Sequence, residues 1–436
     1  VNLTFTLPRC LRNSCSFAAM IDRHMMMKKL QGFLSVALLF TASAAMGQQV
    51  VESSFGKGVY VVASDSSFSM KFNARVQSLL MFEAPSDNIS MEGMTSNWLI
   101  RRSRLKFSGF AYSPKLKYKI ELGLSNRDHG GESIHTNNTS NLILDAFVSW
   151  NFYKNMEVWI GQTKLPGNRE RVISSQKLQF VDRSLVNSRF NIDRDMGVQF
   201  RNKVNFGPVV TRQALAISQG EGRNRTNKKD PNPLSGYEYT GRLEILPLGE
   251  FTGKGDYFSS DLKREETPKV SFGVTYDVNK NAARVGGNLG SYIEDTNDQV
   301  IDSVLTDLNT VLADVLLKYK GFSLLAEYAN KSMTGGRVED TGGSIINNYY
   351  TGTGLNVQAG YLLKNNLEPS IRVTTITPEL ESGRDLQEMI TFGLSKYIKG
   401  HSLKVQTDFS ILTETNQVSL TEDKTLMFRF QVEMAF

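Results

Sequence analysis

The last eleven residues of the chain, from Leu426 to Phe436, read LMFRFQVEMAF. Apolar side chains occupy every second position, and Arg429, Gln431 and Glu433 stand on the opposite parity. Alternate residues of a β-strand point to opposite faces, so this stretch presents one apolar face and one polar face. That pattern is typical of the closing strand of a membrane-spanning barrel, with lipid on one side and water on the other. Taken alone, it fits an ordinary half-buried strand equally well.

The start of the chain favours the membrane interpretation. A basic n-region, an eleven-residue apolar core and a small-x-small motif ending at Gly47 together predict a secretory signal peptide at 25–47. The apolar core is too short to cross ~30 Å of hydrocarbon as a helix. We therefore expect an exported protein, with 1–24 as an upstream start-site extension outside the mature chain and 48–66 as a short periplasmic lead-in.

Cysteine content and charge narrow the possible classes of protein. Cys10 and Cys15 both precede the predicted cleavage point, so the mature chain carries no thiol for disulfides or metal sites. The formal net charge is +6, but residues 1–47 hold five basic residues and one acidic residue, which leaves +2. Any affinity for anions must therefore come from the placement of charges. After the signal peptide no run approaches 18 apolar residues, whereas a closed barrel needs only one residue in two to face lipid.

Sixteen segments with period-2 alternation follow the signal peptide, an even number as bacterial barrels require. They are 68–82, 98–112, 115–124, 142–151, 156–164, 195–202, 208–219, 237–247, 269–277, 311–319, 322–330, 353–363, 368–377, 388–398, 401–414 and 425–436. Short connections alternate with long polar ones, as in barrels with periplasmic turns and external loops. The connection 248–268 breaks this rule and predicts either a periplasmic excursion or a missed strand pair. The fold prediction is all-β: a transmembrane antiparallel β-barrel of about sixteen strands over 67–436.

A barrel of this size leaves an aqueous channel, so the polar parity of each strand is expected to line a pore. On the first three strands that parity is markedly basic, and the remaining strands offer no comparable concentration. We therefore expect one basic wall that attracts anions. The predicted pore-lining residues are Lys71, Arg75, Arg102, Arg104, Lys106, Lys117 and Lys119.

The connection at about 165–194 is too long for a passive connector, and such loops often fold into a barrel and narrow it. It is rich in arginine, whose planar fork binds phosphate or carboxylate oxygens through paired donors. The predicted constriction residues are Arg169, Arg171, Arg183, Arg189 and Arg194. The alternative is a salt-bridged surface loop, or basic residues that contact lipopolysaccharide phosphates.

Several stretches resemble the phosphate-selective porin O/P family. They are RRSRLKFSG at 101–109, YKIELGLSNRD at 118–128, GQTKLPGNRER at 161–171, LQFVDRS at 178–184 and DRDMGVQ at 193–199. The resemblance is close over 65–201. From there to Phe436 it is weaker and extends only to the predicted arrangement of strands. It implies a sixteen-stranded, trimeric porin that passes anions, phosphate among them. The sequence does not show the continuous ladder of inward arginines that the best-known family members have.

An outer-membrane barrel enzyme is the main alternative, and it would need a base beside a nucleophile or a paired acid site. His129, His135 and His401 have no partner that the spacing indicates, and no phosphate loop, zinc pair or nucleophile elbow is present. We therefore expect a passive outer-membrane diffusion channel with no catalytic residue, cofactor or metal. A structural or adhesin barrel, and a channel that is non-selective or passes sugar-type solutes, remain open.

The expected partners follow from the predicted location and from the resemblance. They are small anions such as phosphate, lipopolysaccharide and outer-membrane lipid, the barrel-assembly machinery acting through the strand that ends at Phe436, and further copies of the chain in a homotrimer. No nucleic-acid partner is expected.

Overall fold

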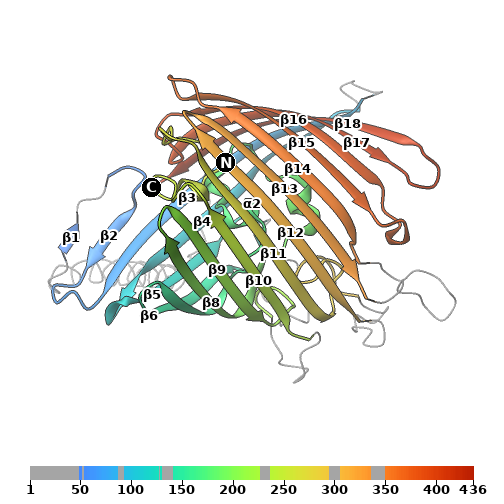
Figure 1. Cartoon of the computed structure of the whole chain (residues 1–436). Helices are drawn as coiled ribbons and strands as arrows, with labels where there is room; N and C mark the ends of the chain where they lie inside the picture. The colour runs from blue at the N-terminus through green and yellow to red at the C-terminus, as the bar shows by residue number, and fades with distance from the viewer. Residues whose placement is uncertain are drawn as a thin grey trace, which may run out of the picture.

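The computed structural model describes residues 49–51, 54–86, 93–126, 128–129, 141–225, 236–293, 305–334 and 349–436. The extension and signal peptide predicted at 1–24 and 25–47 lie outside these residues. The described chain forms one antiparallel sheet that closes on itself as a barrel (Figure 1). Within the described ranges, no helix is both long and apolar enough to cross a membrane.

Sixteen strands make up the barrel, which confirms the predicted fold class and strand number. They are β3 (Ser69–Pro85), β4 (Thr95–Ala111), β5 (Ser113–Gly123), β6 (Ile143–Tyr153), β7 (Met156–Lys164), β8 (Arg194–Phe206), β9 (Val209–Ser218), β10 (Glu238–Leu246), β11 (Lys269–Ala282), β12 (Thr306–Tyr319), β13 (Phe322–Met333), β14 (Gly352–Tyr361), β15 (Leu367–Pro378), β16 (Leu386–Tyr397), β17 (Leu403–Thr415) and β18 (Glu422–Ala435). Every predicted segment is a strand, and the ends differ by at most five residues because alternation fades where strands leave the hydrocarbon.

Each barrel strand pairs with the next one along the chain, and β18 pairs with β3 to close the ring. The register of this seam places Phe428 opposite Phe82. Two short strands, β1 (Gln49–Val51) and β2 (Val59–Val62), lie within the predicted lead-in, and β2 pairs with the start of β3. The seam leaves the barrel strands without an open edge, as a sheet in lipid requires.

Burial along the strands is inverted relative to a soluble sheet. On β18, Arg429 and Glu433 are 6% and 0% exposed, whereas Phe428 and Phe430 are 42% and 40% exposed. The same alternation of buried polar and exposed apolar residues runs through β10 to β17. The exposed apolar face meets hydrocarbon and the polar face points into the barrel, as the sequence alternation predicts.

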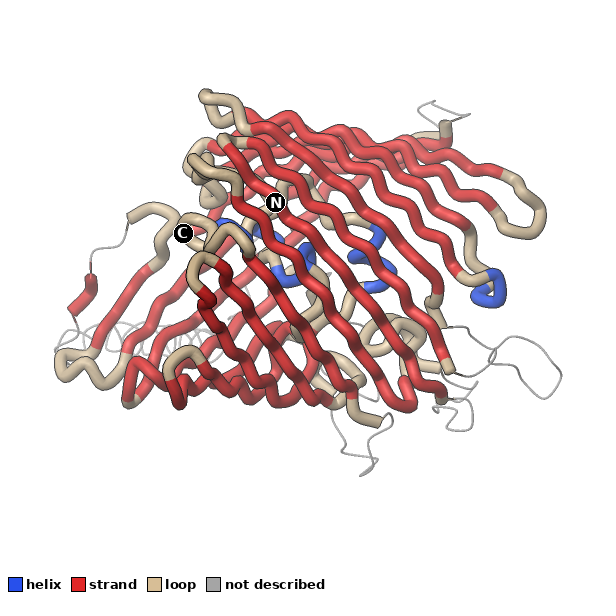
Figure 2. The backbone as a smooth tube through the Cα atoms, in the orientation of Figure 1, coloured by secondary structure: helices blue, strands red, loops and turns tan. Residues whose placement is uncertain are grey.

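The connection between β7 and β8, residues 165–193, lies inside the ring of strands and is called the inward loop below (Figure 2). It contains three short helices: α2 (Arg169–Val172), η2 (Ser175–Lys177) and α3 (Leu185–Phe190). Its apolar side chains form a small core against inward-facing residues of β12, β13 and β15. The members of this core are Val186, Phe190, Ile192, Leu312, Ala329, Tyr350 and Ile376.

The connection between β10 and β11, residues 247–268, also turns into the barrel, from the end with the short turns. It holds one helical turn, η3 (Gly255–Tyr257), and no strand pair, so the missed-strand alternative is wrong. The Nζ of Lys318, on β12, donates to three of its backbone carbonyls at 2.7 to 2.8 Å. The Ser259 N–H donates to the Lys177 carbonyl of the inward loop at 3.0 Å. Two connections from opposite ends of the barrel therefore meet inside it.

Candidate functional site

Buried ion pairs hold the first part of the inward loop against the barrel wall. The Arg169 side chain is fully buried, with Nη2 2.8 Å from the Glu244 carboxylate of β10 and Nε 3.3 Å from Asp314 of β12. The Glu170 carboxylate accepts hydrogen bonds from the Ser184 N–H and hydroxyl at 3.0 and 2.6 Å. A buried charge is tolerated only when it is paired and hydrogen-bonded, so these contacts fix the position of the loop.

Three arginines converge on one carboxylate at the far side of the inward loop. Asp182 lies 2.6, 3.0 and 3.8 Å from the guanidiniums of Arg101, Arg102 and Arg429. Burial raises the pKa of Asp182, but the charges of Arg102, Arg101 and Arg429 outweigh it and hold that pKa well below its usual range. A bulge in β4 turns Arg101 inward beside Arg102, because the register with β3 shifts there. Strict alternation in the sequence places only Arg102 inward.

A cavity of about 870 Å³ lies between the inward loop and the wall formed by β3 to β10. Its lining includes Asn155 and Gly253, which belong to short-turn-side connections, so the cavity extends to the periplasmic end of the barrel. Twelve Arg and Lys residues line it, against five Asp and Glu residues. The chain carries little net charge, but this cavity is strongly basic.

Four of the seven residues predicted on the first three strands line this cavity: Arg75, Arg104, Lys106 and Lys119. The other three lie outside its lining. Arg102 binds Asp182 and the Gln77 side chain, Lys71 lies on β3 directly opposite Ser108, and Lys117 is exposed near the short-turn end of β5.

Among the five loop arginines, only Arg194 lines the cavity, and it pairs with Asp145 at 2.8 Å. The others hold the loop in place. Arg169 forms the buried pairs described above, and Arg171 pairs with Asp193 at the base of the loop. Arg183 donates to two loop carbonyls at 2.7 and 2.9 Å, and Arg189 donates to Gln387 of β16 at 3.1 Å.

The basic lining extends beyond the three strands that the sequence analysis selected. The expectation that other strands carry no comparable concentration is wrong, because β8, β9 and β10 add four inward cations: Arg201, Lys203, Arg212 and Arg242. The alternation rule could have identified them, since they alternate along their strands with exposed apolar residues. Lys164, Lys177 and Lys254 come from the ends of strands and from connections, where alternation gives no signal.

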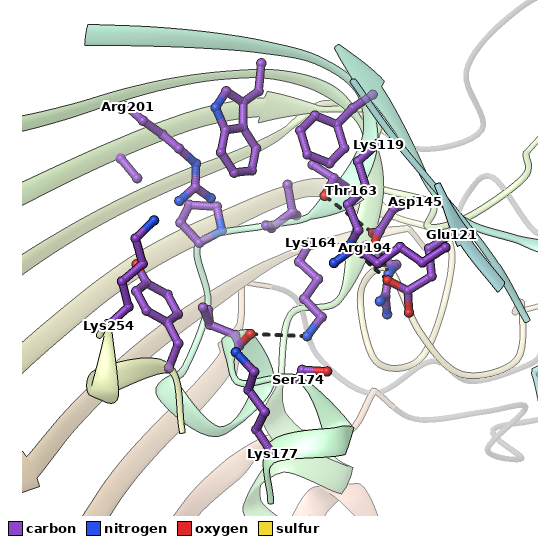
Figure 3. A pocket seen from close by; sticks show the side chains of 18 of the residues that line it. Lys119, Glu121, Asp145, Thr163, Lys164, Ser174, Lys177, Arg194, Arg201 and Lys254 are labelled. Atoms are coloured by element: carbon purple, nitrogen blue, oxygen red, sulfur yellow. Dashed lines mark hydrogen bonds and ion pairs between the residues drawn. The ribbon is translucent and has the colours of Figure 1, made fainter. Parts of the chain in front are cut away.

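The twelve cavity cations fall into two groups. Seven contact carboxylates: Arg75, Arg104, Lys119, Arg194, Lys203, Arg212 and Arg242. The other five have no carboxylate within ion-pair distance among the described residues: Lys106, Lys164, Lys177, Arg201 and Lys254. Figure 3 shows Arg201 and Lys254 on one side of the cavity, Lys119 and Asp145 on the other, and Lys164 between them. The five residues without a carboxylate, Lys106, Lys164, Lys177, Arg201 and Lys254, are called the unpaired cations below.

Two of the unpaired cations have surroundings that affect the site: Lys164 binds the end of a loop helix, and Lys177 lies near other positive charges. Lys164 Nζ donates to the carbonyls of Arg171, Val172 and Ile173 at 2.6 to 3.4 Å, so it fixes the end of α2 at the cavity rim. Burial and the charges of Lys106 and Lys254 lower the pKa of Lys177 to about 8. Like charges thus act on one another across a shared space.

The histidines do not assemble into a catalytic group within the described residues. The His129 ring lies 3.0 Å from the Gly123 carbonyl, and the buried His401 ring packs against Phe258 and Tyr397. His135 lies outside the described residues. In the part of the chain that the structure describes, no group of three or more His, Cys, Asp and Glu residues could hold a metal ion.

Comparison with known proteins assigns the chain to a family. A model of the family "Phosphate-selective porin O and P" matches residues 73–436. An uncharacterized protein of Aquifex aeolicus (strain VF5) is 25% identical over 370 residues, which cover 78% of this chain and 80% of that protein.

A solved outer-membrane channel shares the fold. The outer membrane channel DcaP of Acinetobacter baumannii superposes with a TM-score of 0.51 at 12% identity, over 86% of this chain and 99% of that chain. The anion-selective porin from Comamonas acidovorans gives a TM-score of 0.49 at 11% identity, over 85% of this chain and all of that one. The chain belongs to the phosphate-selective porin O and P family and is a passive channel of the bacterial outer membrane.

Proposed function

We propose that this porin passes small anions in preference to cations, with phosphate-type anions among its solutes. The observation that carries the proposal is the set of five unpaired cations around one cavity. An ion pair has a weak field at a distance, whereas an unpaired cation in a cavity with low-dielectric walls attracts anions and repels cations. The name of the family is consistent with this preference.

Four of the five unpaired cations are lysines, namely Lys106, Lys164, Lys177 and Lys254. Lys164 is bound to three loop carbonyls, so Lys106, Lys177 and Lys254 carry the following argument. A lysine ammonium is a compact, well-hydrated point charge, whereas paired arginine forks bind a phosphate tightly through several parallel hydrogen bonds. Such a lining attracts an anion without holding it for long, as a diffusion channel requires. We therefore propose a general anion preference with weak, millimolar-range binding.

The test is the reversal potential of the purified protein in a planar bilayer under a tenfold KCl gradient. Wild-type channels should favour chloride. Charge reversal at Lys177 and Lys254 (K177E/K254E) should lower the chloride-to-potassium permeability ratio by about threefold or more, because two of five unpaired cations become anions. The control is Lys424→Glu, which reverses an exposed charge at the loop end of β18.

A cation-favouring reversal potential in the wild type would contradict the anion proposal. An unchanged ratio in the double variant would show that the selective residues lie elsewhere. A shift in the control as large as that in K177E/K254E would mean that the surface potential, and not the cavity, sets the ratio.

Three partners are proposed from family membership: two further copies in a homotrimer, lipopolysaccharide, and the barrel-assembly machinery acting on β18. One contact supports the last of them. The main-chain groups of Phe436 and Ala74 exchange two hydrogen bonds of 2.9 Å, so Phe436 takes part in the seam that closes the barrel. The mass of the native complex in mild detergent tests the trimer.

A further inference from the structure

The cavity that holds the unpaired cations also holds aromatic rings. Phe147, Trp159, Tyr257 and Phe258 all line it. Phe147 and Trp159 stand on the inward parity of β6 and β7, where a porin strand ordinarily carries polar residues. The outward neighbour Trp150 is 56% exposed to the lipid side, as the rule requires. Departures from a local rule are expected where a protein uses the site.

A glycine makes room for this inward aromatic pair. Gly161 lies directly opposite Phe147 in the register of β6 and β7, and it has φ +129°, outside the usual range of L-residues. A Cβ at Gly161 would come 2.8 Å from the Phe147 Cα. With no side chain there, the Phe147 ring packs across β7 onto Trp159, with ring centres 4.7 Å apart and planes 16° apart. The pair is therefore built by three residues together.

The stacked pair also positions an arginine. The Arg201 guanidinium of β8 lies 4.3 Å from the centre of the Trp159 ring. Its Nε and Nη2 donate to the Gln199 Oε1 at 3.2 and 2.7 Å, which fixes the plane of the group. Arg201 is the single arginine among the unpaired cations, and its guanidinium lies over an indole ring.

Cations and rings also meet on the side of the inward loop. The Lys177 ammonium lies 3.7 Å from the centre of the Phe258 ring, and the Tyr257 ring lies 5.7 Å from the Arg212 guanidinium. Figure 3 shows Lys177 and Arg201 approaching the same space from different elements. The lining therefore alternates positive charge with aromatic surface on both sides of the cavity.

We propose that this cavity selects anions that carry a planar aromatic ring, such as aryl phosphates and aryl carboxylates, over bare inorganic phosphate. The inference rests on the anion preference proposed above and names the class of solute. The anionic head binds the ammonium of Lys177 or Lys254, and the ring stacks on the Arg201 guanidinium plane or on an aromatic face. Bare phosphate gains little from such a lining, because it needs converging N–H donors, whereas Nε and Nη2 of Arg201 already bind Gln199 and the guanidinium lies over Trp159.

The experiment compares phenyl phosphate with methyl phosphate, which share a head group and differ in the ring. Each is titrated against the single-channel chloride current of the whole protein in a planar bilayer. Phenyl phosphate should halve the current at a roughly tenfold lower concentration. Trp159→Leu should reduce that difference to about twofold, because it removes the ring that supports Arg201. The matched control is Trp150→Leu on the lipid face of the adjacent strand, which should keep the tenfold difference.

Two results would overturn the inference: equal blocking concentrations of the two phosphates in the wild type, or an equal loss in both tryptophan variants. Either result leaves the chloride preference measured by reversal potential untouched, so the proposed function would survive it. A wild-type channel without chloride preference would instead defeat the proposed function. If Trp159→Leu does not fold, Phe147→Leu removes the other half of the stack and gives the same reading.

Discussion

The charged residues on the inner face of the barrel form two sets that differ in their burial. On β11 to β18, the inward Asp314, Glu327 and Lys404 are 3%, 2% and 0% exposed because the inward loop covers them. Beside the cavity, the side chains of Lys119 on β5 and Lys203 on β8 are 25% and 34% exposed. Arg75 of β3 and Arg102 of β4 belong with the first set, because both are buried and bind the inward loop. The inward side chains that the inward loop covers are called the packed wall, and those that are exposed at the cavity are called the open wall. An inward charge is therefore either covered by the inward loop or exposed at the cavity.

The physical cost of a broken contact differs between the two walls. When one partner of a buried ion pair is removed, the other charge is left buried and unpaired, and the free energy of unfolding falls by about 3–5 kcal/mol. An exposed pair contributes roughly 0–1 kcal/mol, since water replaces either partner. The packed wall should therefore control stability, and the open wall should control selectivity.

The largest effect is expected at Arg169, a fully buried residue of the inward loop that binds carboxylates of β10 and β12. Arg169→Met removes one buried partner of each carboxylate and leaves Glu244 with Arg212 and Arg242, and Asp314 with Arg242. The free energy of unfolding should fall by about 3 kcal/mol, the low end of the cost of removing a buried partner, because the carboxylates keep part of their pairing. The control Lys203→Met breaks an exposed pair with Glu250 and should cost less than ~1 kcal/mol. Urea unfolding in detergent, followed by tryptophan fluorescence, measures both. Equal costs would show that the two walls do not differ in this way.

A somewhat smaller effect is expected at Asp182, where the loop meets three arginines. Because the folded-state pKa lies below the unfolded value, the stabilisation is present above about pH 4 and is lost as the pH falls below it. Asp182→Asn should lower stability at pH 7 by roughly 1.5–3 kcal/mol and flatten the dependence of stability on pH below 4. The control is Asp423→Asn at the exposed loop end of β18. A variant that keeps the full acid sensitivity of the wild type would refute this role.

The smallest expected effect concerns the pH dependence of selectivity at Lys177, where the inward loop borders the cavity. The pKa of Lys177 is about 8, so this residue loses its charge as the pH rises from 7 to 9. The chloride-to-potassium permeability ratio should fall over that range by about 1.5-fold, because one of five unpaired cations is neutralised. Lys177→Met should start with a lower ratio and lack the step. Lys254→Met should also start lower but keep a step, shifted to higher pH because the Lys254 charge no longer lowers the pKa of Lys177. Reversal potentials at pH 7 and pH 9 make the comparison, and a pH-independent ratio in the wild type would contradict it.

The fold was largely predictable because alternation reflects a strict division between lipid and water on every strand. The rule failed where the backbone leaves regular pairing. The bulge in β4 turns Arg101 inward, against its parity, and Arg101 then binds Asp182. The connection 247–268 reads as an irregular polar stretch, and only its contacts with Lys318 and with the inward loop reveal that it enters the barrel.

The site was harder to predict, because its function depends on which charges lack a partner. Arg169 and Arg201 look alike in the sequence, yet Arg169 is neutralised by residues 75 and 145 positions away, and Arg201 stacks on Trp159. No local sequence pattern shows which residues of the inward loop contact which residues of the packed wall. Alternation therefore identifies residues that point inward, but not which of them remain available to a solute.

The contact between Asp182 and Arg429 places a constraint on the order of assembly. Asp182 follows β7, whereas Arg429 lies on β18, so the loop cannot complete its arginine cluster until the closing strand has entered the membrane. The strand that seals the cylinder against β3 thus also supplies one of the three arginines that hold the inward loop. Arg101 and Arg102 of β4 can bind Asp182 before β18 is in place, and the contact with Arg429 is added when the barrel closes.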